Sequence, residues 1–195
     1  QGPGEPTLVL VLAGVIVGTV GQALIALTKY LVDPTNTLAA ITFWLMGSLA
    51  SVGRGDLAVA TPPILGGLVI LLLLRWRLNL MAFGDEEART LGVAAGRLRL
   101  VVVLAATLMT ASAVAISGVI ALVGLIVPHL ARMLVGPNFS TLLPVSALLG
   151  ALFLLAVDDL ARGLVAGEIP LGILTALIGA PFFIGLLLDS RKGWS

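Results

Sequence analysis

The sequence predicts an all-α fold, a polytopic bundle of transmembrane helices. Hydrophobic residues make up 59% of the 195 positions and charged residues only 11%, whereas soluble domains carry about 25% charged residues. The mean hydropathy is +1.15. Apolar runs of roughly 20 residues, the length that crosses a bilayer core, recur along the chain. These observations exclude a water-soluble globular protein.

The first half of the chain contains two predicted spans. Residues 8–28 end before Lys29, and residues 57–74 end at Arg75. Between them, residues 35–50 are too short and too mixed in polarity to cross comfortably. We therefore expect a re-entrant or interfacial helix there, with its aromatic side chains at headgroup depth.

Four more spans are predicted in the second half, at residues 100–117, 119–135, 141–162 and 171–188. Only the Ser117-Gly118 step joins the first two of these, so we expect them to form a tight antiparallel pair. The whole chain, residues 1–195, is predicted to be a single transmembrane domain of six spans.

The basic residues indicate how the bundle is oriented. Of the 11 Lys and Arg residues, one side of a six-span bundle receives Arg75, Arg77, Arg89, Arg97, Arg99, Arg132, Arg191 and Lys192. The other side receives Lys29, Arg54 and Arg162. Cytoplasmic loops carry the excess of basic residues, so both termini and loop 75–99 are predicted to be cytoplasmic. The apolar start lacks a basic n-region, so we expect no cleavable signal peptide; Gln1 in place of Met suggests a processed or partial chain.

Residues 84–93 form the most informative soluble segment. Asp85 suits an N-cap, Glu86 and Glu87 suit the positive N-terminal end of a helix, and Gly92 suits a left-handed C-terminal position. Two-turn helices are marginal in water, so something must hold this one. It is either a solvated connector between two spans or an element that docks a partner.

The sequence offers no catalytic site, cofactor site or metal site. Zero cysteines exclude thiolate zinc sites, and a single histidine, His129, cannot form a multi-histidine centre. We expect His129 to have a structural hydrogen-bonding role, with Pro128 kinking its helix. The net charge of +1 argues against nucleic acid as a partner.

Polar residues within or beside the spans are candidates for other roles. Thr19 and Gln22 in the first span make it a candidate wall of a translocation path. Asp158 and Arg162 lie four residues apart and either pair on one helix face or leave the arginine for an acidic partner. Small residues at four-residue spacing on the last span favour close packing: Gly172, Ala176 and Ala180.

Three segments resemble the FecCD-type permeases, the membrane subunits of ATP-binding cassette (ABC) importers for iron chelates, haem and vitamin B12. They are GDEEARTLGV at 84–93, GVIALVGLIVPHLAR at 118–132 and EIPLGILTALIGAPFF at 168–183. They occur in family order, and the resemblance covers nearly the whole chain. It implies a type II importer fold of which this chain is a part, beginning near the fifth of ten family helices.

The resemblance also implies roles and partners. The segment at 85–93 matches the coupling helix that enters a cleft of the ATPase, which assigns this role to Asp85, Glu86, Glu87, Ala88, Arg89, Leu91 and Gly92. Arg162 matches an arginine offered to the binding protein, and Pro128, His129 and Arg132 belong to a structural motif. The implied partners are ABC ATPase subunits, a periplasmic or lipid-anchored substrate-binding protein, and a second permease copy or complementary half in the bacterial inner membrane.

The expected function is ATP-driven import of an iron-siderophore by alternating access, with haem or cobalamin as alternatives. The permease itself is not expected to be an enzyme. An ion-coupled secondary transporter would need Asp, Glu or His within the spans, and an intramembrane enzyme would need a nucleophile with its base or a metal cluster. The sequence supplies neither.

Overall fold

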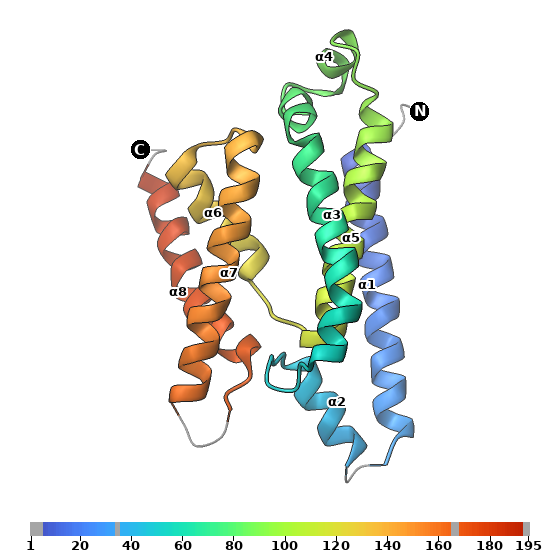
Figure 1. The fold of residues 1–195 in the computed structure, drawn as a ribbon, viewed down its shortest axis with the longest axis vertical. Coiled ribbons are helices and arrows are strands. Elements are labelled where there is room, and N and C mark those ends of the chain that lie inside the picture. Colours follow the sequence, from blue (N-terminus) through green and yellow to red (C-terminus); the bar gives the residue numbers. More distant parts are fainter. Residues whose placement is uncertain (1–5, 34–35, 165–167, 193–195) are drawn as a thin grey trace. The chain divides into compact units, whose positions relative to one another are not determined.

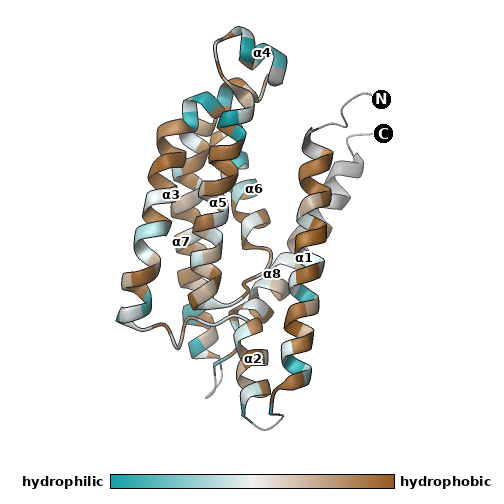
Figure 2. Cartoon of the chain, turned by 90° about the vertical axis from the view of Figure 1, so that its right-hand side faces the viewer, coloured by the Kyte–Doolittle hydropathy of each residue, from teal (hydrophilic) through white to brown (hydrophobic). Residues whose placement is uncertain are grey.

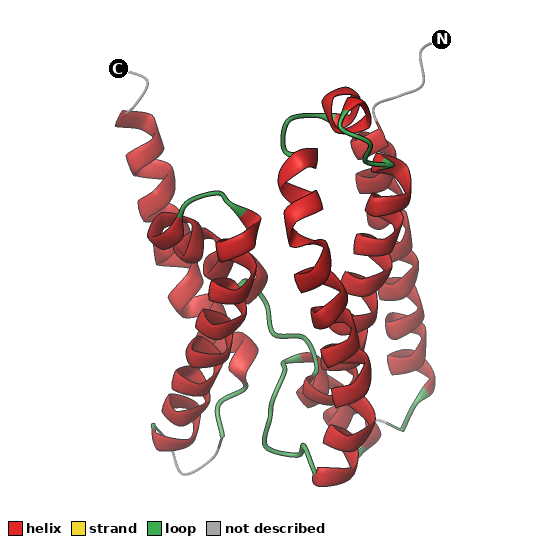
Figure 3. Ribbon diagram, turned by 45° about the horizontal axis from the view of Figure 1, so that its top comes forward, coloured by secondary structure: helices red, strands yellow, loops and turns green. Residues whose placement is uncertain are grey.

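The computed structural model describes residues 6–33, 36–164 and 168–192, and all the regular secondary structure among them is helical (Figure 3). These residues form α1 (Pro6–Leu31), α2 (Thr37–Leu45), α3 (Arg54–Met81), α4 (Asp85–Thr90), α5 (Ala95–Ser117), α6 (Val123–Val135), α7 (Phe139–Gly163) and α8 (Leu171–Lys192). The predicted all-α fold is confirmed.

The chain divides into two compact units, residues 1–43 and residues 44–195. The first unit contains α1 and most of α2. Helix α1 has 26 residues, and none of its most apolar 18-residue window is buried. Its side chains are therefore suited to contact with lipid or with other helices rather than with water.

In the second unit, α3 packs against α5, α7 packs against both α3 and α6, and α8 packs against α6 and α7 (Figure 1). The expected antiparallel pairing of 100–117 with 119–135 is therefore wrong. The helix breaks at Gly118, where φ is +68°, and Leu122 is also left-handed with φ +66°. Residues 118–122, which are not helical, carry the chain from α5, beside α3, to α6, beside α7.

Four described helices are long and apolar enough to cross a membrane: α1, α3, α5 and α7. Helix α6, inside the predicted span 119–135, has only 13 residues. At 1.5 Å per residue it extends about 20 Å, short of a bilayer core of about 30 Å. Helix α2 has 9 residues, which fits the expectation of a short non-spanning helix.

Polar residues gather at α4, whereas apolar residues predominate along α3, α5 and α7 (Figure 2). We call the end that carries α4 the α4 end. The start of α3 and the end of α7 lie at the opposite end, which we call the Arg162 end (Figure 1).

Three interrupted stretches of backbone meet toward the Arg162 end, near the start of α3 (Figure 1). We call this meeting point the junction; it consists of residues 44–48, 117–119 and 170–172. The amide N–H of Ser48 donates to the carbonyl of Ser117 (2.8 Å) at the end of α5. The first amides of α8 donate to carbonyls just beyond α2, Leu171 to Gly47 (2.8 Å) and Gly172 to Met46 (3.0 Å). Groups that helix ends leave unpaired therefore bond to one another.

Glycines allow the backbones to come this close. A Cβ on Gly47 would lie 2.7 Å from the carbonyl oxygen of Val119, and one on Gly118 would collide with the carbonyl of Trp44. A Cβ on Gly172 would collide with the carbonyl of Met46. Gly47 and Gly118 also have positive φ, +74° and +68°, which other residues adopt at a cost. At Gly47 and Gly118 a side chain is therefore disfavoured both by close contacts and by the backbone conformation, and at Gly172 by the close contact alone.

A buried apolar cluster lies at the junction and beside it. Val157 and Ala161 of α7 and Leu171 at the start of α8 form a buried cluster. Thr175 is fully buried, and its hydroxyl donates to the carbonyl of Gly172 (3.2 Å). The polar hydroxyl is thus satisfied without water.

We predict that Gly118→Ala lowers the unfolding free energy by at least about 2 kcal/mol, because the new methyl group combines a positive φ with a backbone collision. The matched control is Gly124→Ala. That glycine lies inside α6 with nothing within 4 Å of an added Cβ, so the control should melt at or slightly above the wild-type temperature. Thermal unfolding in detergent, followed by gel filtration, measures both. Equal melting temperatures for the two variants would contradict the role given to the junction.

Candidate functional site

Helix α4 is a short, separately capped element between α3 and α5. Asp85 was expected at the N-cap, but Gly84 occupies that position with φ +112°, and Asp85 is the first helical residue. A Cβ on Gly84 would lie 2.6 Å from a carboxylate oxygen of Glu87. The absence of a side chain at residue 84 therefore lets Glu87 lie over the helix start.

The end of α4 follows the prediction. Gly92 is left-handed with φ +81°. The Val93 amide donates to the carbonyl of Ala88 (2.9 Å) and the Gly92 amide donates to that of Arg89 (2.9 Å). These bonds satisfy the last carbonyls of the helix and turn the chain toward α5.

One face of α4 is anchored and the other is free to meet a partner. Ala88 has 0% exposure, and α4 packs against both α3 and α5. Glu86, Glu87 and Arg89 are exposed, and Leu91, just past the helix, is 60% exposed. The helix is thus held within the chain through Ala88, and the side chains of Glu86, Glu87 and Arg89 are exposed.

A polar cluster that sequence reasoning missed ties α3 to α7 at the α4 end. The Asn79 amide nitrogen donates to the Asn138 side-chain oxygen (2.8 Å) and to the Ser140 hydroxyl (3.2 Å). The Asn79 oxygen accepts from the Phe139 amide (2.7 Å). Arg75 donates to the Ser140 carbonyl (3.1 Å). Asn138 also caps α7, accepting from the Ser140 amide (2.9 Å), so one side chain serves both the cap and the link to α3.

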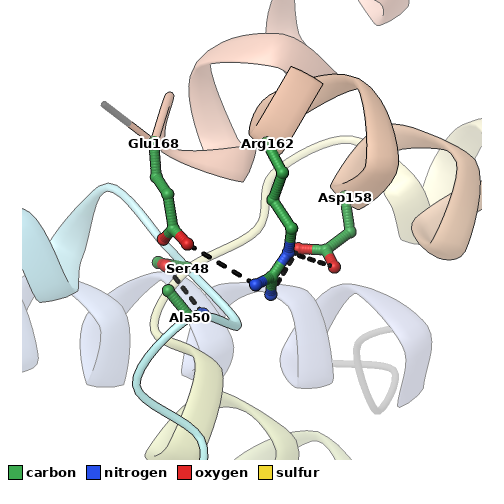
Figure 4. A network of polar contacts seen from close by, with 5 residues as sticks. All are labelled: Ser48, Ala50, Asp158, Arg162 and Glu168. Carbon is green, nitrogen blue, oxygen red and sulfur yellow. Dashed lines mark hydrogen bonds and ion pairs between the residues drawn. The ribbon is translucent and has the colours of Figure 1, made fainter. Parts of the chain in front are cut away.

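The Arg162 end carries a compact charged cluster (Figure 4). The Nε of Arg162 lies 2.9 Å from Oδ2 of Asp158, and its Nη2 lies 3.3 Å from Oδ1. Glu168 approaches more loosely, with Oε1 3.5 Å from Nη1. The predicted pairing on one helix face is confirmed. The arginine side chain is still 46% exposed, so the pairing leaves part of the guanidinium open to a partner.

An apolar groove of about 960 Å³ follows α8 from the junction. The small residues Gly172, Ala176 and Ala180 line it, together with Met46 and Val119 from the other two stretches of the junction. We call it the α8 groove. Its lining has no charged residue among the described side chains, so it suits a second helix or another apolar surface.

The remaining predicted residues lie apart from these features. Thr19 and Gln22 lie in the first unit; the Thr19 hydroxyl donates to the Val15 carbonyl (2.8 Å), and Gln22 is exposed. Half-buried His129 of α6 meets the ring of Phe182 edge to face, with centroids 6.0 Å apart, where a hydrogen-bonding role was expected. Pro128 lies inside α6 and Arg132 in its last turn. No cluster of metal-ligating side chains occurs among the residues searched, those with described positions.

The model of the FecCD transport family matches residues 1–189. The molybdate import system permease protein MolB of Haemophilus influenzae is 46% identical over 186 residues, which are 95% of this chain and 55% of MolB. The cobalamin import system permease protein BtuC of Halobacterium salinarum is 44% identical and covers 94% of this chain and 49% of its own. The hemin transport system permease protein HmuU of Yersinia pestis is 42% identical, with 94% and 55% covered. The chain thus spans about half the length of the curated relatives it matches.

A solved structure is similar over the same range. It is described as an inward-facing conformation of a proposed metal-chelate type ABC transporter, and it matches with a TM-score of 0.90 and 46% identity. The match covers 94% of this chain and 60% of the other. The arrangement of helices reported above is therefore shared with a membrane transporter.

We predict that Asn79→Ala weakens the link between α3 and α7. It removes three hydrogen bonds and leaves the Phe139 amide without its partner, so the unfolding free energy should fall by about 1–3 kcal/mol. Thr141→Ala is the control, because it removes only the exposed local bond to the Asn138 carbonyl (3.1 Å). Thermal unfolding in detergent compares the two. A loss for Thr141→Ala as large as that for Asn79→Ala would refute the assignment.

Proposed function

The chain belongs to the FecCD transport family, and from this premise we propose that it is the helix-bundle part of a permease in an ATP-driven importer. The observation that carries the proposal is α4: a short helix fixed through Ala88 that presents Glu86, Glu87 and Arg89 outward on the Arg-rich side. This is the geometry that a membrane subunit needs to receive force from an ATPase subunit. Hydrolysis of ATP belongs to that partner, and the permease contributes no covalent chemistry.

The packing supports a mechanism in which α4 moves the spans as rigid bodies. When the ATPase pair closes on ATP, the force on α4 passes to α3 and α5, which hold it. Asn79 passes the force on to α7 through its bonds to Asn138 and Phe139. Rigid rotation of packed helices is a usual route to alternating access. Thr19 and Gln22 of α1 are proposed to line the path that opens and closes.

For the cargo we propose a metal-containing small molecule, with an iron-siderophore as the first compound to test and haem and cobalamin as the next. The relatives are named for three different cargoes: molybdate, cobalamin and hemin. The family comparison lends no support to an ion-coupled secondary transporter. A path with few fixed charges suits a bulky chelate that is carried whole.

Two partner surfaces complete the proposal. Arg162 offers its exposed guanidinium to a carboxylate of a substrate-binding protein on the outer side of the bacterial inner membrane. The α8 groove packs against a second permease copy or a complementary permease half, because its small residues allow backbones to approach closely without hydrophobic driving force.

We predict that reversing the charges on α4, with Glu86→Lys, Glu87→Lys and Arg89→Glu together, abolishes co-purification of the ATPase and uptake of a labelled iron-siderophore. Complementary charges across an interface become repulsive when reversed. The control is Asp159→Lys, an exposed site on α7 at the Arg162 end with the same net change in charge. Both variants should fold, since the altered side chains are exposed. Unchanged co-purification in the triple variant would count against α4 as the coupling element.

We predict that Arg162→Ala weakens association with the binding protein by about tenfold and that added salt reduces the wild-type affinity toward that of the variant. Glu168→Gln should instead strengthen association, because Glu168 competes for the guanidinium at 3.5 Å, while Asp158 continues to orient it. Surface-immobilised permease and titrated binding protein give both affinities. Lower affinity in Arg162→Ala together with higher affinity in Glu168→Gln supports docking at Arg162. Lower affinity in both variants would indicate that the ion-pair cluster is only structural.

A further inference from the structure

A second groove lies at the α4 end, apart from the α8 groove. It has a volume of about 470 Å³ and lies where α3 ends and α5 begins. Arg77 of α3 and Arg97 of α5 line it, and Leu91 and Val93 from the loop after α4 also contribute. Two separate helices therefore each bring one arginine to the same groove.

The two arginines carry uncompensated charge. Both side chains are exposed, and neither makes a hydrogen bond or ion pair with any residue in the described part of the chain. Arg75 and Arg162 differ in this respect, since Arg75 donates to the Ser140 carbonyl and Arg162 pairs with Asp158. The acidic residues Glu86 and Glu87 of nearby α4 do not line the groove. Among the side chains that the structure describes, the groove thus carries positive charge without a counter-ion in its lining.

The rest of the groove is apolar and runs along the spans. Leu74 of α3 and Leu98 and Val101 of α5 form its wall, and both helices belong to the long apolar set. Trp76, which is 65% exposed, lies at its edge. Tryptophan is enriched at the level of lipid headgroups, so the groove passes from a charged part at headgroup depth to an apolar part within the membrane.

We propose that this groove binds an anionic phospholipid, with the headgroup phosphate between Arg77 and Arg97 and the acyl chains along Leu74, Leu98 and Val101. Guanidinium groups match phosphate oxygens through paired hydrogen bonds, and basic pockets between spans on the cytoplasmic side suit anionic headgroups. An acidic segment of a partner protein would neutralise the arginines but leave the apolar wall uncovered. The bound lipid joins α3 to α5 directly below the loop that carries α4.

The test is lipid retention by the purified chain, together with any subunits that accompany it, in native mass spectrometry. The protein is exchanged into nanodiscs that contain equal amounts of phosphatidylglycerol and phosphatidylcholine. The wild type should retain phosphatidylglycerol preferentially, and Arg77→Gln and Arg97→Gln should each reduce this preference by about fivefold. Arg54→Gln, at the opposite end of α3, removes the same charge and should leave the preference unchanged. Equal retention of the two lipids by the wild type, or an equal loss in Arg54→Gln, overturns the proposal.

A second measurement uses the wild-type protein and does not depend on how the arginine variants fold. Brominated phosphatidylglycerol should quench the tryptophan fluorescence more than brominated phosphatidylcholine does, and Trp76→Phe should abolish that difference. If the difference in quenching between the two lipids persists in Trp76→Phe, the lipid does not bind beside Trp76 and the proposed location is wrong. If Arg77→Gln with Arg97→Gln releases the ATPase subunit while lipid retention and quenching stay unchanged, the groove is a protein contact and the lipid proposal is wrong.

Discussion

Backbone polar groups that leave a helix away from water must find partners within the protein, and the fold depends on how the junction meets this requirement. Each unsatisfied group in hydrocarbon costs several kcal/mol. Here the carbonyls just beyond α2 accept from the first amides of α8, and the last carbonyl of α5 accepts from Ser48. Three interruptions that would each be costly alone become acceptable because they lie together. Gly47, Gly118 and Gly172 make the contact possible, since any side chain there would strike a carbonyl.

The junction lies between two groups of packed helices in the second unit. On one side, α3 and α5 hold α4 through Ala88; on the other, α6 and α8 pack on α7. Helix α7 also packs on α3, and Asn79 fixes its start. Its far end carries Arg162. One helix therefore extends from beside the element proposed to meet the ATPase to the residue proposed to meet the binding protein.

Much of this could be predicted from the sequence, because local patterns determine it. Apolar runs gave the long helices, Gly92 gave the left-handed end of α4, and four-residue spacing gave the pair of Asp158 and Arg162. The end of one span at Ser117 was predicted, but the length of the break was not: residues 119–122 are as apolar as a helix core, although α6 begins only at Val123. Asp85 was predicted as the N-cap of α4 because its side chain favours that position. The N-cap is instead Gly84, whose positive φ other residues adopt at a cost. The role of Asn79 could not be predicted, because its partner Asn138 is 59 positions away in the sequence. Only the structure shows that Asn138 both caps α7 and bonds to Asn79.

The bonds from Leu171 and Gly172 back to Gly47 and Met46 also constrain biogenesis. The ribosome delivers α2 and the end of α5 to the membrane long before α8 is made. Until then the carbonyls beyond α2 have no native donor, and water, lipid headgroups or the insertion machinery must shelter them. Entry of α8 is thus the step that completes the junction, and a nascent chain stalled before Leu171 leaves these carbonyls without their native donors.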